Sequence, residues 1–120
     1  MADFRQLKVW QKAHELTLKI YQITNRFPRE ELYGLTSQIR RASVSVASNI
    51  AEGDGRYHKS DKLKFFIDSR SSINEVKAQL LIAGDLYSKL SKEVLGLFDN
   101  YGILERQLNK LITYRRSHGK

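Results

Sequence analysis

The chain has 120 residues, a net charge of +8 and no cysteine. Its length fits one domain with a single core, residues 1–120, and the lack of cysteine excludes disulfides, thiolate metal sites and cysteine nucleophiles. The longest uncharged run, Ala42 to Ala51, has ten residues, whereas a membrane span needs about 20. We therefore expect a cytoplasmic protein with no membrane partner. Its excess of basic over acidic residues favours polyanions as binding partners.

The first predicted element is a helix that ends at Phe27 and Pro28. Apolar residues from Val9 to Phe27 recur at a 4-3-4-3-4 spacing, which is typical of one helix face. The proline ends the helix because the residue before a proline disfavours the α conformation. Trp10 lies beside this apolar line, and we expect it to be largely buried.

The second predicted helix, from about Tyr33 to Glu52, has two apolar sides. The main side is formed by Leu35, Ile39, Ala42, Val46, Asn49 and Ile50, and the second side by Val44, Ala47 and Ala51. A surface helix shows only one apolar stripe, so we predict neighbours on more than one side. The second side is the candidate oligomer interface, and Gly53 and Gly55 are expected to end the helix.

Two longer helices are predicted to follow. Ser60 or Asp61 caps the third, whose apolar residues continue to Leu90, and Ser91 caps the fourth, with a 3-4-3-4-3 spacing from Val94 to Leu111. No segment alternates as a strand would. Four helices joined by short loops predict an all-α fold, an antiparallel up-down-up-down four-helix bundle.

Catalytic and metal-binding patterns are missing from the sequence. A di-iron bundle needs Glu-x-x-His pairs, but the residues three positions after Glu15, Glu52 and Glu75 are Leu18, Gly55 and Ala78. The three histidines have no ligand-like spacing. We therefore expect no catalytic residue, no metal and no cofactor; an enzyme with a site made between subunits remains a third option.

Four polar residues on helices two and three, Arg41, Asn49, Glu52 and Glu75, are predicted to form a structural polar network. Because these helices run antiparallel, Arg41 and Glu75 lie at similar depth and could pair. A buried pair would fix the register of the helices or join subunits. The alternative is a polyanion contact through Arg40 and Arg41.

Most of the positive charge gathers at one end of the predicted bundle. The start of helix one, the turn after helix two and the C-terminal segment with Lys120 meet there and carry seven of the eight net charges. Phosphate binding there would be salt-sensitive and largely independent of sequence; a solvated charged surface is the usual alternative. The candidate nucleic-acid-binding residues are Arg5, Lys8, Lys12, Arg56, Lys59, Lys62, Lys64, Lys110, Arg115 and Arg116.

Five segments resemble, in the same order, one bacterial family. They are Val9–Ala13, Phe27–Pro28 with Glu31–Leu35, Gln38–Ala42, Ser48–Gly53 and Glu75–Leu80. This is the four-helix-bundle family first found encoded in intervening sequences of 23S ribosomal RNA genes. The resemblance implies a bundle that assembles as a ring, a pentamer, and no established activity. A similar bundle is the accessory protein of a reverse transcriptase in diversity-generating retroelements, which implies RNA or DNA as a partner.

The sequence and this resemblance together predict a non-enzymatic, homo-oligomeric basic bundle. It would bind RNA or DNA, or act as an accessory to a nucleic-acid enzyme. The alternative function is a protein-interaction scaffold with a protein partner and no nucleic-acid role, in which case the basic end only keeps the protein in solution.

Overall fold

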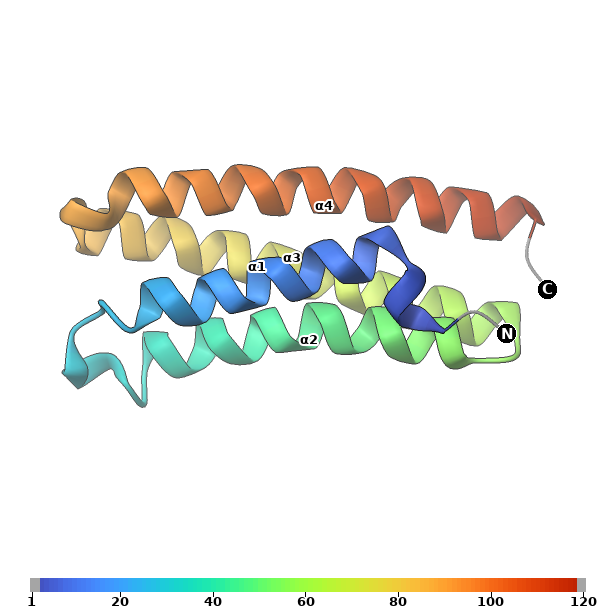
Figure 1. Ribbon diagram of the computed structural model, residues 1–120, viewed down its shortest axis with the longest axis horizontal. Helices are drawn as coiled ribbons and strands as arrows, with labels where there is room; N and C mark the ends of the chain where they lie inside the picture. Colours follow the sequence, from blue (N-terminus) through green and yellow to red (C-terminus); the bar gives the residue numbers. More distant parts are fainter. Residues whose placement is uncertain (1–2, 119–120) are drawn as a thin grey trace.

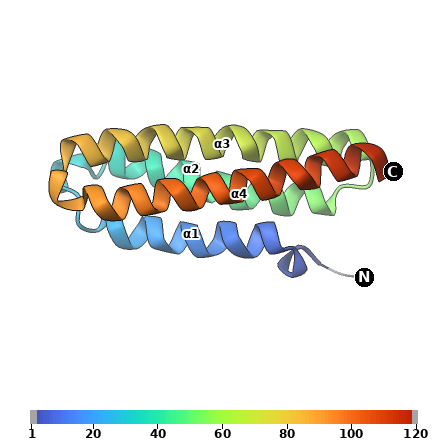
Figure 2. The ribbon, with the colours of Figure 1, turned by 90° about the horizontal axis from the view of Figure 1, so that it is seen from above.

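The computed structural model describes residues 3–118, which form four long helices joined by short connections (Figure 1). The helices are α1 (Lys8–Thr24), α2 (Leu35–Gly55), α3 (Lys59–Leu86) and α4 (Ser91–His118). Short 3-10 helices precede α1 (η1, Phe4–Gln6), α2 (η2, Arg29–Glu31) and α4 (η3, Ser88–Leu90). Consecutive helices run in opposite directions (Figures 1 and 2), so the all-α, up-down-up-down prediction is confirmed. Residues 3–118 contain no strand.

The apolar line of α1 faces the core as its spacing predicts, and Val9, Ala13, Leu16, Ile20 and Ile23 are buried. Trp10 differs from the expectation, because it is only partly buried. Its ring stacks on the imidazole of His14, with centroids 4.9 Å apart, and meets the Phe4 ring edge-on at 5.0 Å. It thus belongs to an aromatic cluster at the rim of the core.

Helix α2 packs against both α1 and α3, which confirms that it has neighbours on more than one side. It begins two residues later than predicted, at Leu35, where the Glu31 carboxylate accepts a hydrogen bond from the Leu35 N–H at 3.1 Å. That contact satisfies one of the free N–H groups of the first turn.

Gly53 and Gly55 do not end α2 in the way that the sequence predicted. The helix continues to Gly55 instead of ending at Glu52, and Gly53 is buried inside its last turn. A Cβ atom at position 53 would lie 2.8 Å from Cε1 of Phe66 and 3.1 Å from the carbonyl oxygen of Lys62. Gly53 is therefore required for the close approach of α2 and α3, not for helix termination. Gly55, where an added Cβ would meet nothing within 4 Å, is the last helical residue.

Helices α3 and α4 start differently from the prediction. Residue His58 precedes α3 without a side-chain cap, so Ser60 and Asp61 lie in its first turn; there the charge of Asp61 favours the helix dipole. Helix α4 follows directly on η3, and Ser91 is its first residue. The buried line of α4 ends on Ile112, since Leu111 is only partly buried.

Small side chains allow α2 and α3 to pack closely. The buried Ser69 hydroxyl donates to the carbonyl oxygen of Val46 at 2.8 Å, which joins the two helices where their surfaces meet. The described core is mainly aliphatic and includes the aromatic residues Phe27, Phe66 and Tyr101, of which Tyr101 and Phe66 are the largest fully buried side chains. Within residues 3–118, no helix combines the length and the apolar character that a membrane span requires.

Candidate nucleic-acid interface

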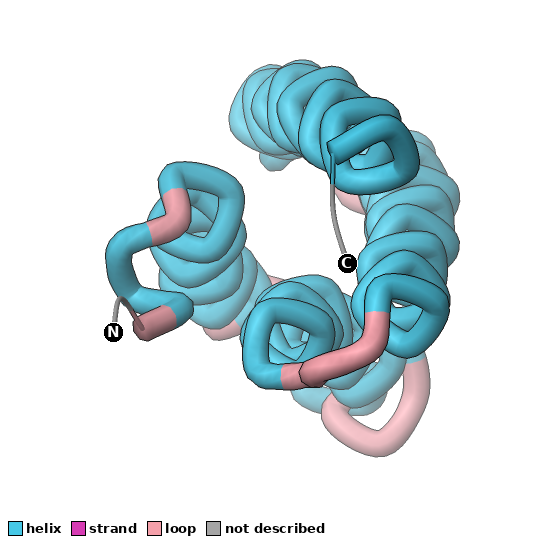
Figure 3. Tube along the Cα trace, turned by 90° about the vertical axis from the view of Figure 1, so that its right-hand side faces the viewer, coloured by secondary structure: helices cyan, strands magenta, loops and turns pink. Residues whose placement is uncertain are grey.

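The α2–α3 turn and the last turns of α4 lie at the same end of the bundle, which Figure 3 views face-on. Two contacts join them directly. The Lys59 ammonium donates to the carbonyl oxygen of Arg116 at 2.6 Å, and the Arg115 guanidinium lies 3.6 Å from the Asp54 carboxylate. We use the name basic end for the cations that this arrangement gathers: Arg56, Lys59, Lys62, Lys64, Lys110, Arg115 and Arg116.

Arg115 has structural contacts in addition to its charge. It pairs with Asp54, and its guanidinium lies 5.7 Å above the ring of the buried Phe66. Lys62 is bound nearby, since its ammonium donates to the backbone carbonyl of Asp54 at 2.9 Å. Arg115 thus links the end of α4 to the end of α2, and a change at this position would disturb packing as well as charge.

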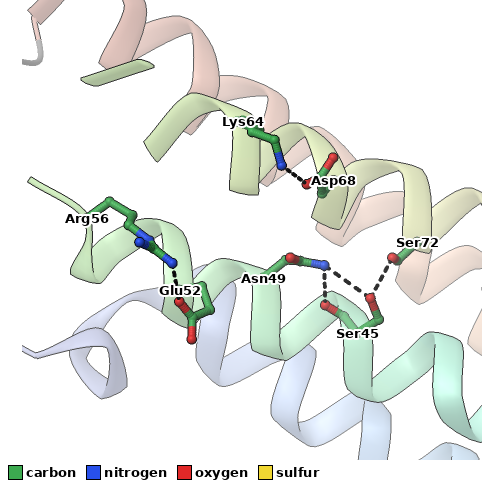
Figure 4. Close-up of polar contacts among 7 residues, drawn as sticks. All are labelled: Ser45, Asn49, Glu52, Arg56, Lys64, Asp68 and Ser72. Carbon is green, nitrogen blue, oxygen red and sulfur yellow. Dashed lines mark hydrogen bonds and ion pairs between the residues drawn. The ribbon is translucent and has the colours of Figure 1, made fainter. Parts of the chain in front are cut away.

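Arg56 and Lys64 both lie near the ring of Phe65, and each pairs with a carboxylate (Figure 4). Arg56 pairs with Glu52 at 3.2 Å and lies 4.7 Å from the centroid of Phe65. Lys64 pairs with Asp68 at 3.3 Å and lies 5.2 Å from the same centroid. Exposed pairs of this kind contribute little to stability, but they reduce the local positive charge.

The N-terminal cations contribute less to the basic end than expected. Lys12 donates a hydrogen bond to the Asn100 side chain at 3.0 Å. At a helical rise of about 1.5 Å per residue, Asn100 lies roughly 27 Å from the C-terminal end of α4. Lys12 therefore lies near the middle of the bundle, and Lys8, one turn before it, is exposed at the start of α1. Helix α1 has 17 residues and α4 has 28, which explains the difference.

Arg5 does lie near the basic end, because η1 packs on α2 and Phe4 lines a shallow hollow with Gly55 and Arg56. Its guanidinium binds the Asp3 carboxylate at 2.6 Å. The hydrogen bond from Arg5 lowers the pKa of Asp3, and the same contact raises the pKa of Arg5. Lys120, which was counted with the C-terminal charge, lies outside the described residues.

Five of the ten candidate cations make no ion pair with a carboxylate of residues 3–118: Lys8, Lys59, Lys62, Lys110 and Arg116. Four of these five belong to the basic end. At the opposite end, Arg26 of α1 pairs with Glu93 of α4. Four of the candidate cations without a carboxylate partner thus lie where α4 ends, although Arg29 and Lys92 at the opposite end make no ion pair within residues 3–118 either.

The four polar residues predicted to form one network are divided between separate contacts. The Asn49 amide donates to the carbonyl and hydroxyl oxygens of Ser45 at 3.0 and 3.1 Å, and the Ser45 and Ser72 hydroxyls are 2.9 Å apart (Figure 4). Glu52 pairs instead with Arg56. Ser72 was missed in the sequence because it lies on another helix, whereas Ser45, four residues before Asn49, could have been found.

Arg41 and Glu75 do lie at similar depth, and both line a polar hollow between α2 and α3 with Gln79. No Arg41–Glu75 ion pair forms within 4.0 Å in this described part of the chain. Both side chains are exposed, so neither needs a partner to offset burial.

The candidate interface residues of α2 differ in exposure. Val44 is 42% exposed, whereas Ala47 is partly buried and packs against the core. Ala51 is partly buried as well and lines the same hollow as Phe4. The second apolar side of α2 is therefore partly covered within one subunit, and Val44 is its exposed member.

Aromatic side chains at the basic end were missed in the sequence. Tyr57 in the α2–α3 turn and Tyr114 near the end of α4 are exposed, and His118 stacks on Tyr114. The signal was present, because each tyrosine directly neighbours a cation in the sequence: Tyr57 follows Arg56 and Tyr114 precedes Arg115.

Comparison with known proteins gives one family and one fold. The family model described as "23S rRNA-intervening sequence protein" matches residues 5–110. A solved structure from Bacteroides thetaiotaomicron, described as a protein of unknown function from the S23 ribosomal protein family, is 17% identical, with a TM-score of 0.80. The similarity covers 88% of this chain and 95% of that one. No curated protein matches the sequence.

Proposed function

This chain belongs to the 23S rRNA-intervening sequence protein family, and within that family we propose for it a non-enzymatic role as a nucleic-acid-binding bundle. The protein works as a homo-oligomer, a pentamer in the form that the resemblance implies, and binds RNA or DNA alone or as an accessory to a nucleic-acid enzyme. The observation that carries the proposal is that the α2–α3 turn and the end of α4 bring seven cations to one end, four of which, Lys59, Lys62, Lys110 and Arg116, make no ion pair with a carboxylate of residues 3–118.

The chemistry of these cations suits phosphate. Lys110 and Arg116 are exposed, and Arg116 offers a planar set of donors that matches phosphate oxygens. Lys59 and Lys62 are held in place by backbone carbonyls, which leave their charge uncompensated. A ring of subunits would repeat this surface, and each neutralised phosphate would release a counterion. The expected binding is strong at low salt and largely independent of sequence.

We expect Lys110→Glu/Arg116→Glu to weaken nucleic-acid binding and to lower the slope of log affinity against log salt by about 2, since each lost phosphate contact removes about 1. Both side chains are exposed, so the fold should be retained. The measurement is fluorescence anisotropy with a labelled oligonucleotide over a salt series, with circular dichroism as the check on folding.

The matched control is Arg29→Glu/Lys92→Glu at the opposite end, where both residues are exposed and make no ion pair with any carboxylate of residues 3–118. It changes the net charge by the same amount and should change affinity much less. Equal losses in the two double variants would mean that only overall charge matters. If the unaltered protein binds no nucleic acid at low salt, the result favours the alternative function, a protein-interaction scaffold.

Assembly is tested separately through Val44. We expect light scattering to give a mass of about five times the 13.9 kDa subunit, and Val44→Glu to reduce it while helicity is kept. Ala47→Glu is a poorer probe, because Ala47 packs against the core of its own subunit. The control is Leu32→Glu, at a loop residue that is 48% exposed. A monomeric mass at high protein concentration would contradict the assembly.

A further inference from the structure

The basic end carries aromatic rings that the charge of the surface does not explain. Tyr57 is 83% exposed and Tyr114 is 57% exposed. Tyr57 makes a T-shaped contact with the His58 ring, with centroids 5.1 Å apart, and its exposure leaves most of the ring open to solvent. Tyr114 stacks with His118 at 4.4 Å and 13°, which forms a two-ring platform on the last turn of α4.

These rings stand among the cations of the basic end. The contact from Lys59 to the carbonyl of Arg116 holds the residues that follow Tyr57 against the residues that follow Tyr114. Phe65, on the same part of the bundle, already has cations over its ring, from Arg56 at 4.7 Å and Lys64 at 5.2 Å. Aromatic rings and positive charges therefore lie together at this end of the bundle.

Such a surface can distinguish unpaired from paired bases. A duplex presents phosphates at high density but hides the faces of its bases, so a purely electrostatic surface would bind a duplex at least as well as a single strand. Aromatic side chains stack on the faces of unpaired bases, in any sequence, because every base has a π-face. Exposed rings beside lysine and arginine are the combination that single-strand-binding proteins use.

We infer that the basic end binds single-stranded RNA or DNA, with unpaired bases stacked on Tyr57 and on the Tyr114–His118 platform and with phosphates on the neighbouring cations. This inference rests on the proposed function and adds to it the class of nucleic acid. Both RNA and DNA single strands carry the required chemistry, so both are included in the test.

The experiment compares labelled RNA and DNA single strands of mixed sequence with their own duplexes, by fluorescence anisotropy at one salt concentration. The unaltered protein should bind each single strand more tightly than the corresponding duplex. Tyr57→Ala and Tyr114→Ala should each weaken single-strand binding about tenfold, which corresponds to about 1.4 kcal/mol for one stacked base. Duplex binding should change little.

Two further variants make the result specific. Tyr33→Ala removes a tyrosine that is 94% exposed at the other end of the bundle, and it should leave both affinities unchanged. Tyr57→Phe keeps the stacking face and should retain single-strand binding. All four variants alter exposed side chains, and circular dichroism verifies that each is folded.

The outcomes separate this inference from the proposed function. If duplexes bind as tightly as single strands and the tyrosine variants have no effect, while Lys110→Glu/Arg116→Glu weakens both, the stacking inference is overturned and nucleic-acid binding stands. Equal losses of single-strand and duplex binding in the tyrosine variants also overturn it. If the unaltered protein binds neither form, both proposals fall together.

Discussion

Phe66→Ala is expected to lower the free energy of unfolding by about 3–5 kcal/mol, the usual cost of truncating a fully buried aromatic side chain. The Phe66 ring is fully buried and lies against the backbone of Gly53. It also lies beneath the guanidinium of Arg115. Its removal would leave a cavity where the ends of α2 and α4 meet the start of α3.

The matched control is Phe65→Ala at the next residue, because Phe65 is only partly buried and its ring is covered mainly by Arg56 and Lys64. Exposed cation–π contacts contribute about 0.5–1 kcal/mol, so this variant should be clearly less destabilised. Urea denaturation followed by circular dichroism measures both. Similar losses in the two variants would show that Phe66 is not the anchor of this end of the core.

The second large effect is expected at alkaline pH and originates at Tyr101. This side chain is fully buried, and its hydroxyl has no hydrogen-bond partner in the described part of the chain. Burial raises the pKa of Tyr101 well above its ordinary value of 10.0. The phenol therefore keeps its proton in the folded protein at pH values where the unfolded chain has lost it.

The sign of the pH dependence follows from this difference. Below about pH 10 the tyrosine is protonated in both states, so stability is unaffected; above it, the folded state binds one more proton than the unfolded state. The free energy of unfolding should then fall by about 1.4 kcal/mol per pH unit. Tyr87 acts in the same direction, since burial and the nearby Glu31 raise its pKa.

Tyr101→Phe should remove the contribution of Tyr101 to this alkaline loss. At neutral pH it should leave stability unchanged or raise it, because a buried hydroxyl without a partner costs about 1–3 kcal/mol. Tyr114→Phe, at an exposed tyrosine, should keep the full loss. The measurement is thermal or urea unfolding from neutral pH to above pH 11. An unchanged slope in Tyr101→Phe would contradict the assignment.

Residue spacing alone determined the elements and the faces that they bury. The buried lines of α1 and α4 follow the 3-4 spacing because a helix returns to the same side every 3.6 residues. The two apolar sides of α2 indicated neighbours on more than one side, and α1 and α3 both pack on it, although the second side was predicted to be an oligomer interface. The sequence also predicted that the α2–α3 turn and the C-terminal end of α4 lie at the same end of the bundle, because short loops make consecutive helices alternate in direction.

Only the tertiary structure determined which side chains of different helices are in contact. These contacts depend on the length of each helix, the position of a residue along the bundle and the direction of its side chain, none of which the spacing of apolar residues encodes. Gly53 was interpreted as a helix stop, but its role is the contact with Phe66 on another helix. Lys12 was placed at the basic end, but the shorter α1 leaves it beside Asn100. Arg115 was predicted to bind nucleic acid, but the Asp54 carboxylate on another helix lies 3.6 Å from its guanidinium. A local pattern fixes which face of a helix is apolar; only the packed bundle fixes which side chains across the helices come within a few ångströms of one another.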